Sequence, residues 1–102
     1  MAKEHIVSEI RWYNIHRSTE AELTGLAQWL APKLGGWINY YGAIRQTALW
    51  EIFSLLNKRL VRWYTNKYKK YRRRVLKAQM KLREICKDYP NLFVHWQYGY
   101  TP

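Results

Sequence analysis

Apolar side chains recur at helical spacing through the second half of the chain. Between residues 46 and 88 they follow one another at steps of three or four, which is the period of one face of an α-helix. These positions, one of them an asparagine, are Trp50, Phe53, Asn57, Leu60, Tyr64, Tyr68, Tyr71, Val75, Ala78, Leu82 and Ile85. The pattern predicts an amphipathic helical region over residues 46–88. Its period fits one long helix as well as two helices broken near Thr65 and Asn66.

The beginning of the chain predicts a helix, a break and a second helix start. Apolar residues between positions 6 and 13 have helical spacing, which predicts an N-terminal helix within residues 1–18. Thr19 and Glu22 have the spacing of a capping box, in which each side chain bonds a free backbone N–H of the other residue. A helix is therefore predicted to start at Thr19.

A proline divides the next segment. Pro32 clashes with helical geometry at the residue before it but suits the first position of a new helix, so the pattern predicts a helical pair over residues 19–44. Gly35 and Gly36 fall inside the second helix, where each costs about 1 kcal/mol relative to alanine. They suggest that another backbone approaches closely there. Gly42 is predicted to end the element.

The tail and the composition complete an all-α prediction. Pro90 ends the helical region, and residues 89–102 contain an apolar run that is expected to fold back on the bundle. Three prolines and five glycines are too few for an all-β sandwich, since such a fold needs a turn about every 8–12 residues. The chain is predicted to form one domain, residues 1–102. Its fold class is a small all-α bundle with a long basic amphipathic C-terminal helix, or helix pair, and a short apolar tail.

Charge is divided unevenly along the chain. Residues 1–57 carry five Lys or Arg and five Glu side chains, whereas residues 58–102 carry thirteen Lys or Arg and two acids, so all of the net +11 belongs to the second half. Residues 67–74 alone hold six cations. A helical wheel of residues 58–87 leaves an arc of about 140° without Lys or Arg, so an apolar face opposes a basic one. Solvated helix surfaces mix signs, and this one contains a single acid, which favours a polyanion and first of all nucleic acid as its partner.

The candidate nucleic-acid contacts are the cations of this face and three other residues. Trp63 falls among the cations on the wheel and is a candidate for stacking on a base. Tyr40 is another, and Asn39 is suited to bond a base edge or a sugar, with a structural hydrogen bond as an equal alternative. The tyrosines at 64, 68 and 71 lie on the apolar stripe and are expected to pack inward. The predicted RNA-binding residues are Lys58, Arg59, Arg62, Trp63, Lys67, Lys69, Lys70, Arg72, Arg73, Arg74, Lys77, Asn39 and Tyr40.

Other chemistries find no support in the sequence. Cys86 is the only cysteine, which rules out an intramolecular disulfide. This and the absence of an export signal predict an intracellular location, either the cytoplasm of a bacterial-type cell or an organelle. The longest run without Lys, Arg, His, Asp or Glu, residues 34–44, has eleven residues and is too short to span a bilayer. The three histidines and Cys86 lack ligand-like spacing, and no catalytic triad or phosphate-binding glycine loop is visible. No metal, cofactor, small-molecule substrate or catalytic residue is therefore predicted.

A family resemblance rests on a specific motif. Residues 30–42 read Leu-Ala-Pro-Lys-Leu-Gly-Gly-Trp-Ile-Asn-Tyr-Tyr-Gly. This run resembles the signature of the group II intron maturase-specific domain, also called domain X or the thumb, which lies near the C-terminus of intron-encoded reverse transcriptases. Ala31 and Gly35 depart from the family pattern, in which asparagine and arginine are usual. Further similar stretches extend the resemblance over residues 10–96: Ile10-Arg11 with Tyr13, Leu26-Ala27-x-Trp29, Asn57-x-x-Leu60-Val61-Arg62-Trp63, Lys67-Tyr68-Lys69 and Pro90-Asn91-Leu92-Phe93-x-His95-Trp96.

The resemblance implies a thumb-like helical bundle that binds structured group II intron RNA and assists its folding and splicing. It implies no catalysis by the domain, because group II introns are themselves ribozymes. Asp88 is the only aspartate, so the paired metal-binding aspartates of a polymerase are absent. Two other readings stay open. One is a basic amphipathic module that docks on an anionic membrane or a partner protein; the other is a docking or DNA-binding subdomain of a missing reverse transcriptase.

Overall fold

The residues that the structure describes form the all-α bundle that the sequence predicts. In this computed structural model residues 2–41 and 46–102 are described, and they contain helices and turns but no strand. The elements in chain order are α1 (Ala2–Tyr13), η1 (Ile15–Arg17), α2 (Leu23–Tyr41), α3 (Gln46–Lys67), η2 (Lys69–Tyr71), α4 (Val75–Asp88) and α5 (Val94–Gln97). The label η marks a short 3₁₀ helix.

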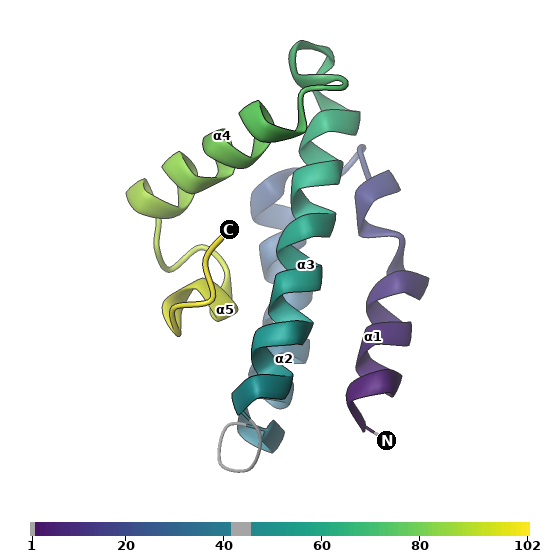
Figure 1. Cartoon of the computed structure of the whole chain (residues 1–102), viewed down its shortest axis with the longest axis vertical. Helices are drawn as coiled ribbons and strands as arrows, with labels where there is room; N and C mark the ends of the chain where they lie inside the picture. The colour runs from purple at the N-terminus through teal and green to yellow at the C-terminus, as the bar shows by residue number, and fades with distance from the viewer. Residues whose placement is uncertain (1, 42–45) are drawn as a thin grey trace.

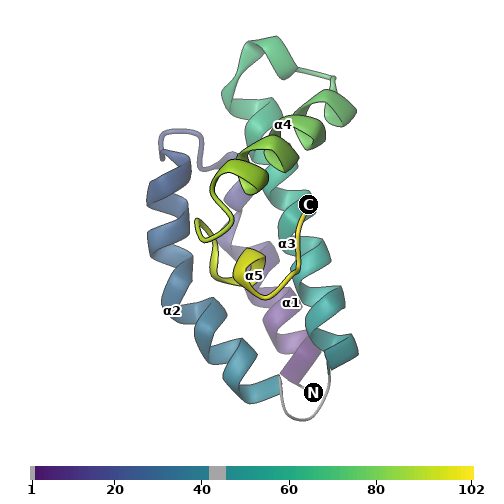
Figure 2. The same cartoon turned by 90° about the vertical axis from the view of Figure 1, so that its left-hand side faces the viewer.

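Helix α3 is the centre of the bundle. It packs against α1, η1, α2 and α4 (Figure 1), and α5 lies in front of the space between α2 and α3 (Figure 2). Apolar side chains from all these elements meet around α3. Members of this core that are almost completely buried include Ile10, Ile15, Leu30, Leu34, Ile52, Phe53, Leu56, Leu60, Leu82 and Phe93. Because α3 is enclosed by its neighbours, little of its surface is left open, and of its cations only Lys58 and Arg62 are exposed.

Residues 23–41 form one helix rather than the predicted pair. Pro32 lies in the interior of α2, so the predicted helix start at this proline is wrong. The buried face of α2 runs from Leu26 to Tyr41 without interruption. Pro32 has no N–H for the carbonyl of Gln28, but both residues are exposed, so water can bond that carbonyl instead. The burial of a continuous apolar face therefore outweighs the preference of proline for the first position of a helix.

The glycines of α2 have no close neighbour within the described chain. A Cβ atom added to Gly35 or Gly36 would meet nothing within 4 Å. The predicted close approach of another backbone at these residues is therefore wrong for the part of the chain that the structure describes. Gly42, the predicted end of the element, lies outside the described residues.

The segment before α2 is shaped by contacts from α3. Helix α2 begins at Leu23, so the predicted helix start at Thr19 is wrong. Carbonyl groups between residues 18 and 21 accept hydrogen bonds from side chains near the end of α3. These long-range bonds hold the segment as a turn and override the local capping signal.

The basic region is two helices separated by a turn. Helix α3 ends at Lys67 and α4 begins at Val75, with η2 between them. The interruption at residues 68–74 comes later than the break near Thr65 and Asn66 that the sequence suggested. The helical wheel therefore describes each of the two helices separately. It does not show that residues of α3 and residues of α4 share one face.

The tail folds back on the bundle, as predicted, and contributes to a buried polar network. Phe93, His95 and Trp96 are buried. His95 Nε2 lies 2.7 Å from Asn57 Oδ1, and Trp96 Nε1 donates to the same oxygen at 3.1 Å. Asn57 Nδ2 donates to the carbonyl of Tyr100 at 3.1 Å. Burial lowers the pKa of His95 to about 3, so the ring is neutral at neutral pH and donates from Nε2.

Candidate nucleic-acid interface

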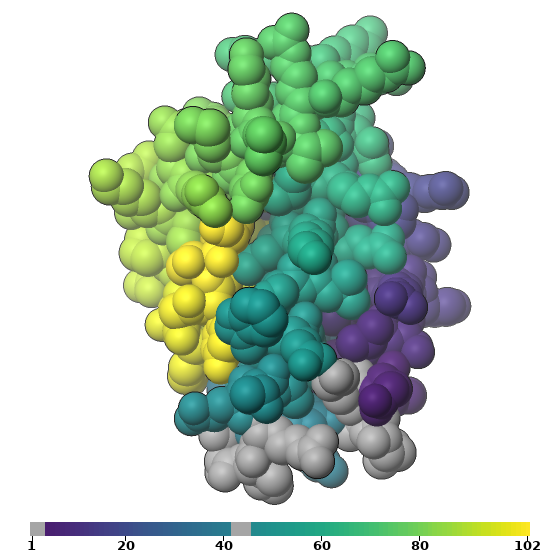
Figure 3. Space-filling model, in the orientation of Figure 1, coloured from purple at the N-terminus to yellow at the C-terminus, as the bar shows by residue number. Residues whose placement is uncertain are grey.

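Most of the predicted cations are exposed, and they concentrate at one end of the bundle. Residues 69–77, here called the basic turn, project beyond the end of α3 (Figure 1), and their side chains extend from the top of the molecule in Figure 3. The exposed cations of the prediction are Lys58 and Arg62 on α3, Lys69 and Lys70 on η2, Arg72, Arg73 and Arg74 after it, and Lys77 at the start of α4. The structure therefore groups six of them on one protruding segment.

Backbone hydrogen bonds give the basic turn a defined shape. The N–H of Tyr71 donates to the carbonyl of Tyr68 at 3.0 Å, and the N–H of Arg74 donates to the carbonyl of Tyr71 at 2.9 Å. Arg73 has φ 62°, in the left-handed region that non-glycine residues rarely adopt. Such a backbone costs about 1 kcal/mol or more, and neighbouring contacts must hold it. The three arginines are thus displayed from a structured turn rather than from a helical face.

The tyrosines beneath the basic turn pack on one another. The ring centroids of Tyr64 and Tyr68 are 4.7 Å apart, and those of Tyr64 and Tyr71 are 5.1 Å apart. Tyr64 is buried, as predicted, and its burial raises the pKa of its hydroxyl. Tyr71 is partly buried, whereas Tyr68 is 37% exposed. The cluster supports the basic turn from below, and only Tyr68 keeps much of its surface open to solvent.

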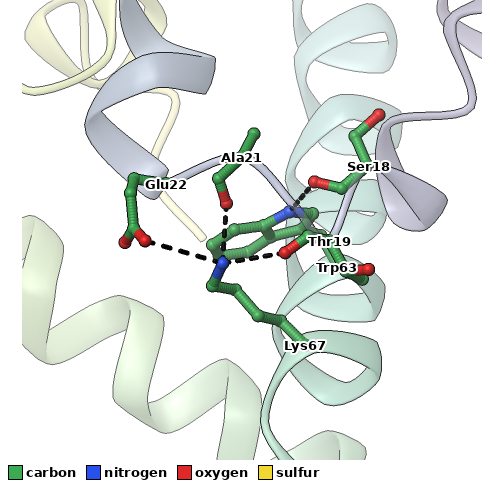
Figure 4. A network of polar contacts seen from close by, with 6 residues as sticks. All are labelled: Ser18, Thr19, Ala21, Glu22, Trp63 and Lys67. Atoms are coloured by element: carbon green, nitrogen blue, oxygen red, sulfur yellow. Dashed lines mark hydrogen bonds and ion pairs between the residues drawn. The ribbon is translucent and has the colours of Figure 1, made fainter.

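Lys67 is a structural cation, which corrects the prediction that it contacts RNA. Its Nζ donates to the carbonyl oxygens of Thr19 and Ala21, at 2.8 Å each (Figure 4). It also lies 3.8 Å from a carboxylate oxygen of Glu22, and the lysine side chain is only 15% exposed. Two of the three donors of the ammonium group are therefore used by backbone carbonyls, and the Glu22 carboxylate lies close enough to balance its charge. Lys67 therefore ties the N-terminal half to the end of α3.

Trp63 is buried, which corrects the prediction that it stacks on a base. Its side chain is 0% exposed, and Nε1 donates to the carbonyl of Ser18 at 2.8 Å (Figure 4). The wheel placed it among the cations of α3, but η1 and the turn after it pack on that side of the helix. No face of the indole is open to a ligand.

Asn39 and Tyr40 are exposed but lie far from the basic turn. Both belong to the last turn of α2, and Tyr40 is 61% exposed. This end of α2 lies beside the start of α3, whereas the basic turn follows the end of α3 (Figure 1). A helix of the length of α3, 22 residues, measures about 33 Å. The structure therefore does not bring Asn39 and Tyr40 into one site with the basic turn.

A second group of cations surrounds His16, on the side of α3 that faces η1. Arg59 Nη1 lies 2.9 Å from His16 Nδ1. A guanidinium group has no acceptor, so it donates, and the imidazole accepts in its neutral form. Burial lowers the pKa of His16, and the charges of Arg59, Arg62 and Arg17 lower it further. Sequence reasoning missed Arg17, because nothing in the residue pattern pairs η1 with α3.

The chemistry of these surfaces is that of guanidinium and ammonium groups. Both bind phosphate oxygens through charge-assisted hydrogen bonds, and the planar guanidinium can do so with two parallel donors. Within residues 2–41 and 46–102, no three His, Cys, Asp or Glu side chains are grouped so that they could hold a metal ion.

The fold and the exposed cations define a class: a small all-helical domain that displays a polybasic turn above a cluster of tyrosines. Residues 3–85 match the family model of the group II intron, maturase-specific domain. The chain belongs to this family, as its signature motif indicated, and the family points to a role in group II intron splicing. No curated protein and no solved structure matches the chain.

Proposed function

We propose that this domain binds structured group II intron RNA through the basic turn and assists splicing without catalysis of its own. The observation that carries the proposal is the segregation of charge. The basic turn displays six exposed cations, and no acidic residue occurs between positions 68 and 83. Such a segment repels itself in the free protein, and a chain of phosphates relieves that repulsion.

Affinity in this proposal comes mainly from phosphate neutralisation. Each phosphate that a lysine or arginine contacts releases condensed counterions from the RNA, which favours binding at low salt. A domain that binds the folded RNA better than the unfolded RNA stabilises the folded state by mass action. Because the intron is itself the ribozyme, the protein need only hold the RNA in its splicing-competent fold.

Salt dependence tests the proposal. The dissociation constant for a labelled group II intron RNA is measured by fluorescence anisotropy between 50 and 200 mM salt. If about six phosphates are contacted, affinity falls by ~10³-fold over this range. An affinity that does not change with salt would contradict the proposal. Unlabelled duplex DNA serves as a competitor, and better competition by DNA than by intron RNA would favour a DNA-binding role.

Docking on a membrane requires the apolar stripe of the basic region to be exposed. Most of that stripe is covered, since Phe53, Leu60, Tyr64, Ala78 and Leu82 are buried, whereas Trp50, Tyr68 and Val75 are exposed. Within the described ranges, every helix is too short or too polar to cross a membrane, which leaves docking on a membrane surface to be tested. Co-sedimentation with anionic liposomes provides the direct test. The proposal predicts that intron RNA releases any protein that the liposomes retain, and retention despite excess RNA would favour the membrane.

A further inference from the structure

Three arginines, from α3 and η1, lie near the buried side chain of His16, and a fourth, from α1, lies near one of them. Arg59 is fixed by the 2.9 Å contact between its Nη1 and His16 Nδ1. Arg62 stands one turn further along α3, and Arg17 follows His16 in η1. Arg11 lies in the last turn of α1. Burial lowers the pKa of Arg59, and the charges of Arg62 and Arg11 add to this effect, as expected of neighbouring cations. We call these five residues the His16 cluster.

The packing of η1 on α3 holds the cluster together. Ile15 is 1% exposed and anchors η1 in the core. Asn66 Nδ2 donates to the carbonyl of His16 at 2.6 Å, which ties η1 to the last turn of α3. Figure 1 shows η1 beside α3, between α1 and the basic turn. The arginines of the cluster therefore project from a fixed part of the fold rather than from a loop.

No arginine of the cluster forms an ion pair with an acid of the described part of the chain. Arg11, Arg17 and Arg62 are exposed, and Arg59 is partly exposed. In residues 2–41 and 46–102, the ion pairs found use lysine or histidine as their cation, not arginine. Guanidinium groups that lie close together repel one another, and an oxyanion placed between them removes the repulsion and accepts their forked N–H donors.

We infer that the His16 cluster is a second phosphate-binding site, in which Arg17, Arg59 and Arg62 hold backbone phosphates of the RNA. The inference rests on the proposed function and adds that the RNA is contacted at two places. Arg62 stands five residues before the end of α3 at Lys67, which is about 7.5 Å along the helix axis, and η2 begins two residues after that end. One RNA can therefore reach both the cluster and the basic turn. His16 is a positioning residue, because it contacts Arg59 and not the phosphate.

A charge-matched pair of variants tests the site. Arg17→Gln combined with Arg62→Gln removes two charges from the cluster, and Lys81→Gln combined with Lys87→Gln removes two from α4. We expect the first variant to bind intron RNA about tenfold more weakly at 100 mM salt. The slope of the logarithm of its association constant against the logarithm of the salt concentration should become less steep by about 1–2. The α4 variant keeps the slope of the unmodified chain.

The outcomes separate this inference from the proposed function. If the unmodified chain shows salt-dependent binding and the Arg17/Arg62 variant keeps its full slope, the second site is refuted while RNA binding through the basic turn stands. If the unmodified chain itself shows no salt-dependent RNA binding, both are refuted. Circular dichroism verifies that each variant is folded before its affinity is compared.

The role of His16 has its own readout. His16→Asn keeps a side-chain acceptor near the place of Nδ1, whereas His16→Leu removes it. Loss of packing alone changes the melting temperature but not the number of phosphates that the folded protein contacts. We therefore expect His16→Asn to retain the salt slope and His16→Leu to lower it. Equal slopes for the two folded variants would refute the positioning role.

Discussion

Acid should destabilise this domain through one buried histidine. His95 is buried between Phe53 and Phe93, and its Nε2 bonds Asn57 Oδ1 at 2.7 Å. Its Nδ1 is buried and has no hydrogen-bond partner, so a proton added there would be neither solvated nor bonded. Burial accordingly lowers the pKa of His95 from 6.5 to about 3. The charged form is accommodated in the unfolded chain but not in the fold.

The expected loss of stability follows from these two pKa values. Between pH 6.5 and pH 3, the unfolded state binds one proton at residue 95 that the folded state does not. Stability is therefore fully present above the unfolded pKa and decreases as the pH falls below it, by up to about 1.4 kcal/mol per pH unit. From pH 7 to pH 5, His95 should lower the free energy of unfolding by about 2 kcal/mol, or the melting temperature by about 8–16 °C for a domain of this size.

Urea unfolding at pH 7, 6 and 5, followed by tryptophan fluorescence, measures this loss. His95→Gln is the matched control, since glutamine keeps an N–H donor for Asn57 but does not titrate in this range. His16, whose pKa is also lowered, is present in both proteins and cancels in the comparison. The unmodified chain should lose about 2 kcal/mol more than the variant between pH 7 and pH 5. Equal losses, or NMR signals of His95 that titrate near pH 6.5 in the folded protein, would refute the reasoning.

Three further substitutions test the packing. Lys67→Met leaves two turn carbonyls without their donor and should cost about 1–3 kcal/mol of unfolding free energy, whereas the exposed control Lys69→Met should stay within about 0.5 kcal/mol. Equal effects in urea unfolding would contradict the structural role of Lys67. Trp63→Phe removes the donor to Ser18 and should lower the free energy of unfolding by about 1–3 kcal/mol, with no change in the salt dependence of RNA binding. A weaker salt dependence would indicate that Trp63 contacts the RNA. Pro32→Ala restores an interior helical hydrogen bond and should stabilise the domain by about 1–3 kcal/mol, and an unchanged melting temperature would show that the proline carries no penalty.

The sequence predicted the helices well because the burial of a helical face is periodic. The apolar stripes of α2 and α3 and the inward tyrosine at 64 appear where the spacing puts them. Pro32 misled the prediction, because a local rule does not register that the proline and its partner carbonyl lie on the solvent side. The interruption after Lys67 was equally hidden, since the residues of the basic turn keep helical spacing although the backbone leaves the helix.

The roles of single residues in the candidate interface depended on contacts between distant parts of the chain. Lys67 and Trp63 resembled interface residues on the wheel, and only the turn at residues 18–21, more than forty positions earlier, shows that both are structural. Arg17 was overlooked because it belongs to the half of the sequence that has no net charge. Only the packing of η1 on α3 brings it to the candidate interface. Charge counts along the chain locate a basic region but do not separate free cations from bonded ones.

One comparison of variants decides whether the three arginines of the basic turn bind RNA. Arg72, Arg73 and Arg74 are replaced together by glutamine, and a control variant carries glutamine at Lys81, Arg83 and Lys87, so that both proteins have the same net charge. We expect both variants to keep the helical circular dichroism of the unmodified chain. Only the first should bind intron RNA more weakly, with a salt slope lower by about 2–3. Equal affinities and slopes for the two variants would contradict the account, because binding would then follow total charge rather than the basic turn.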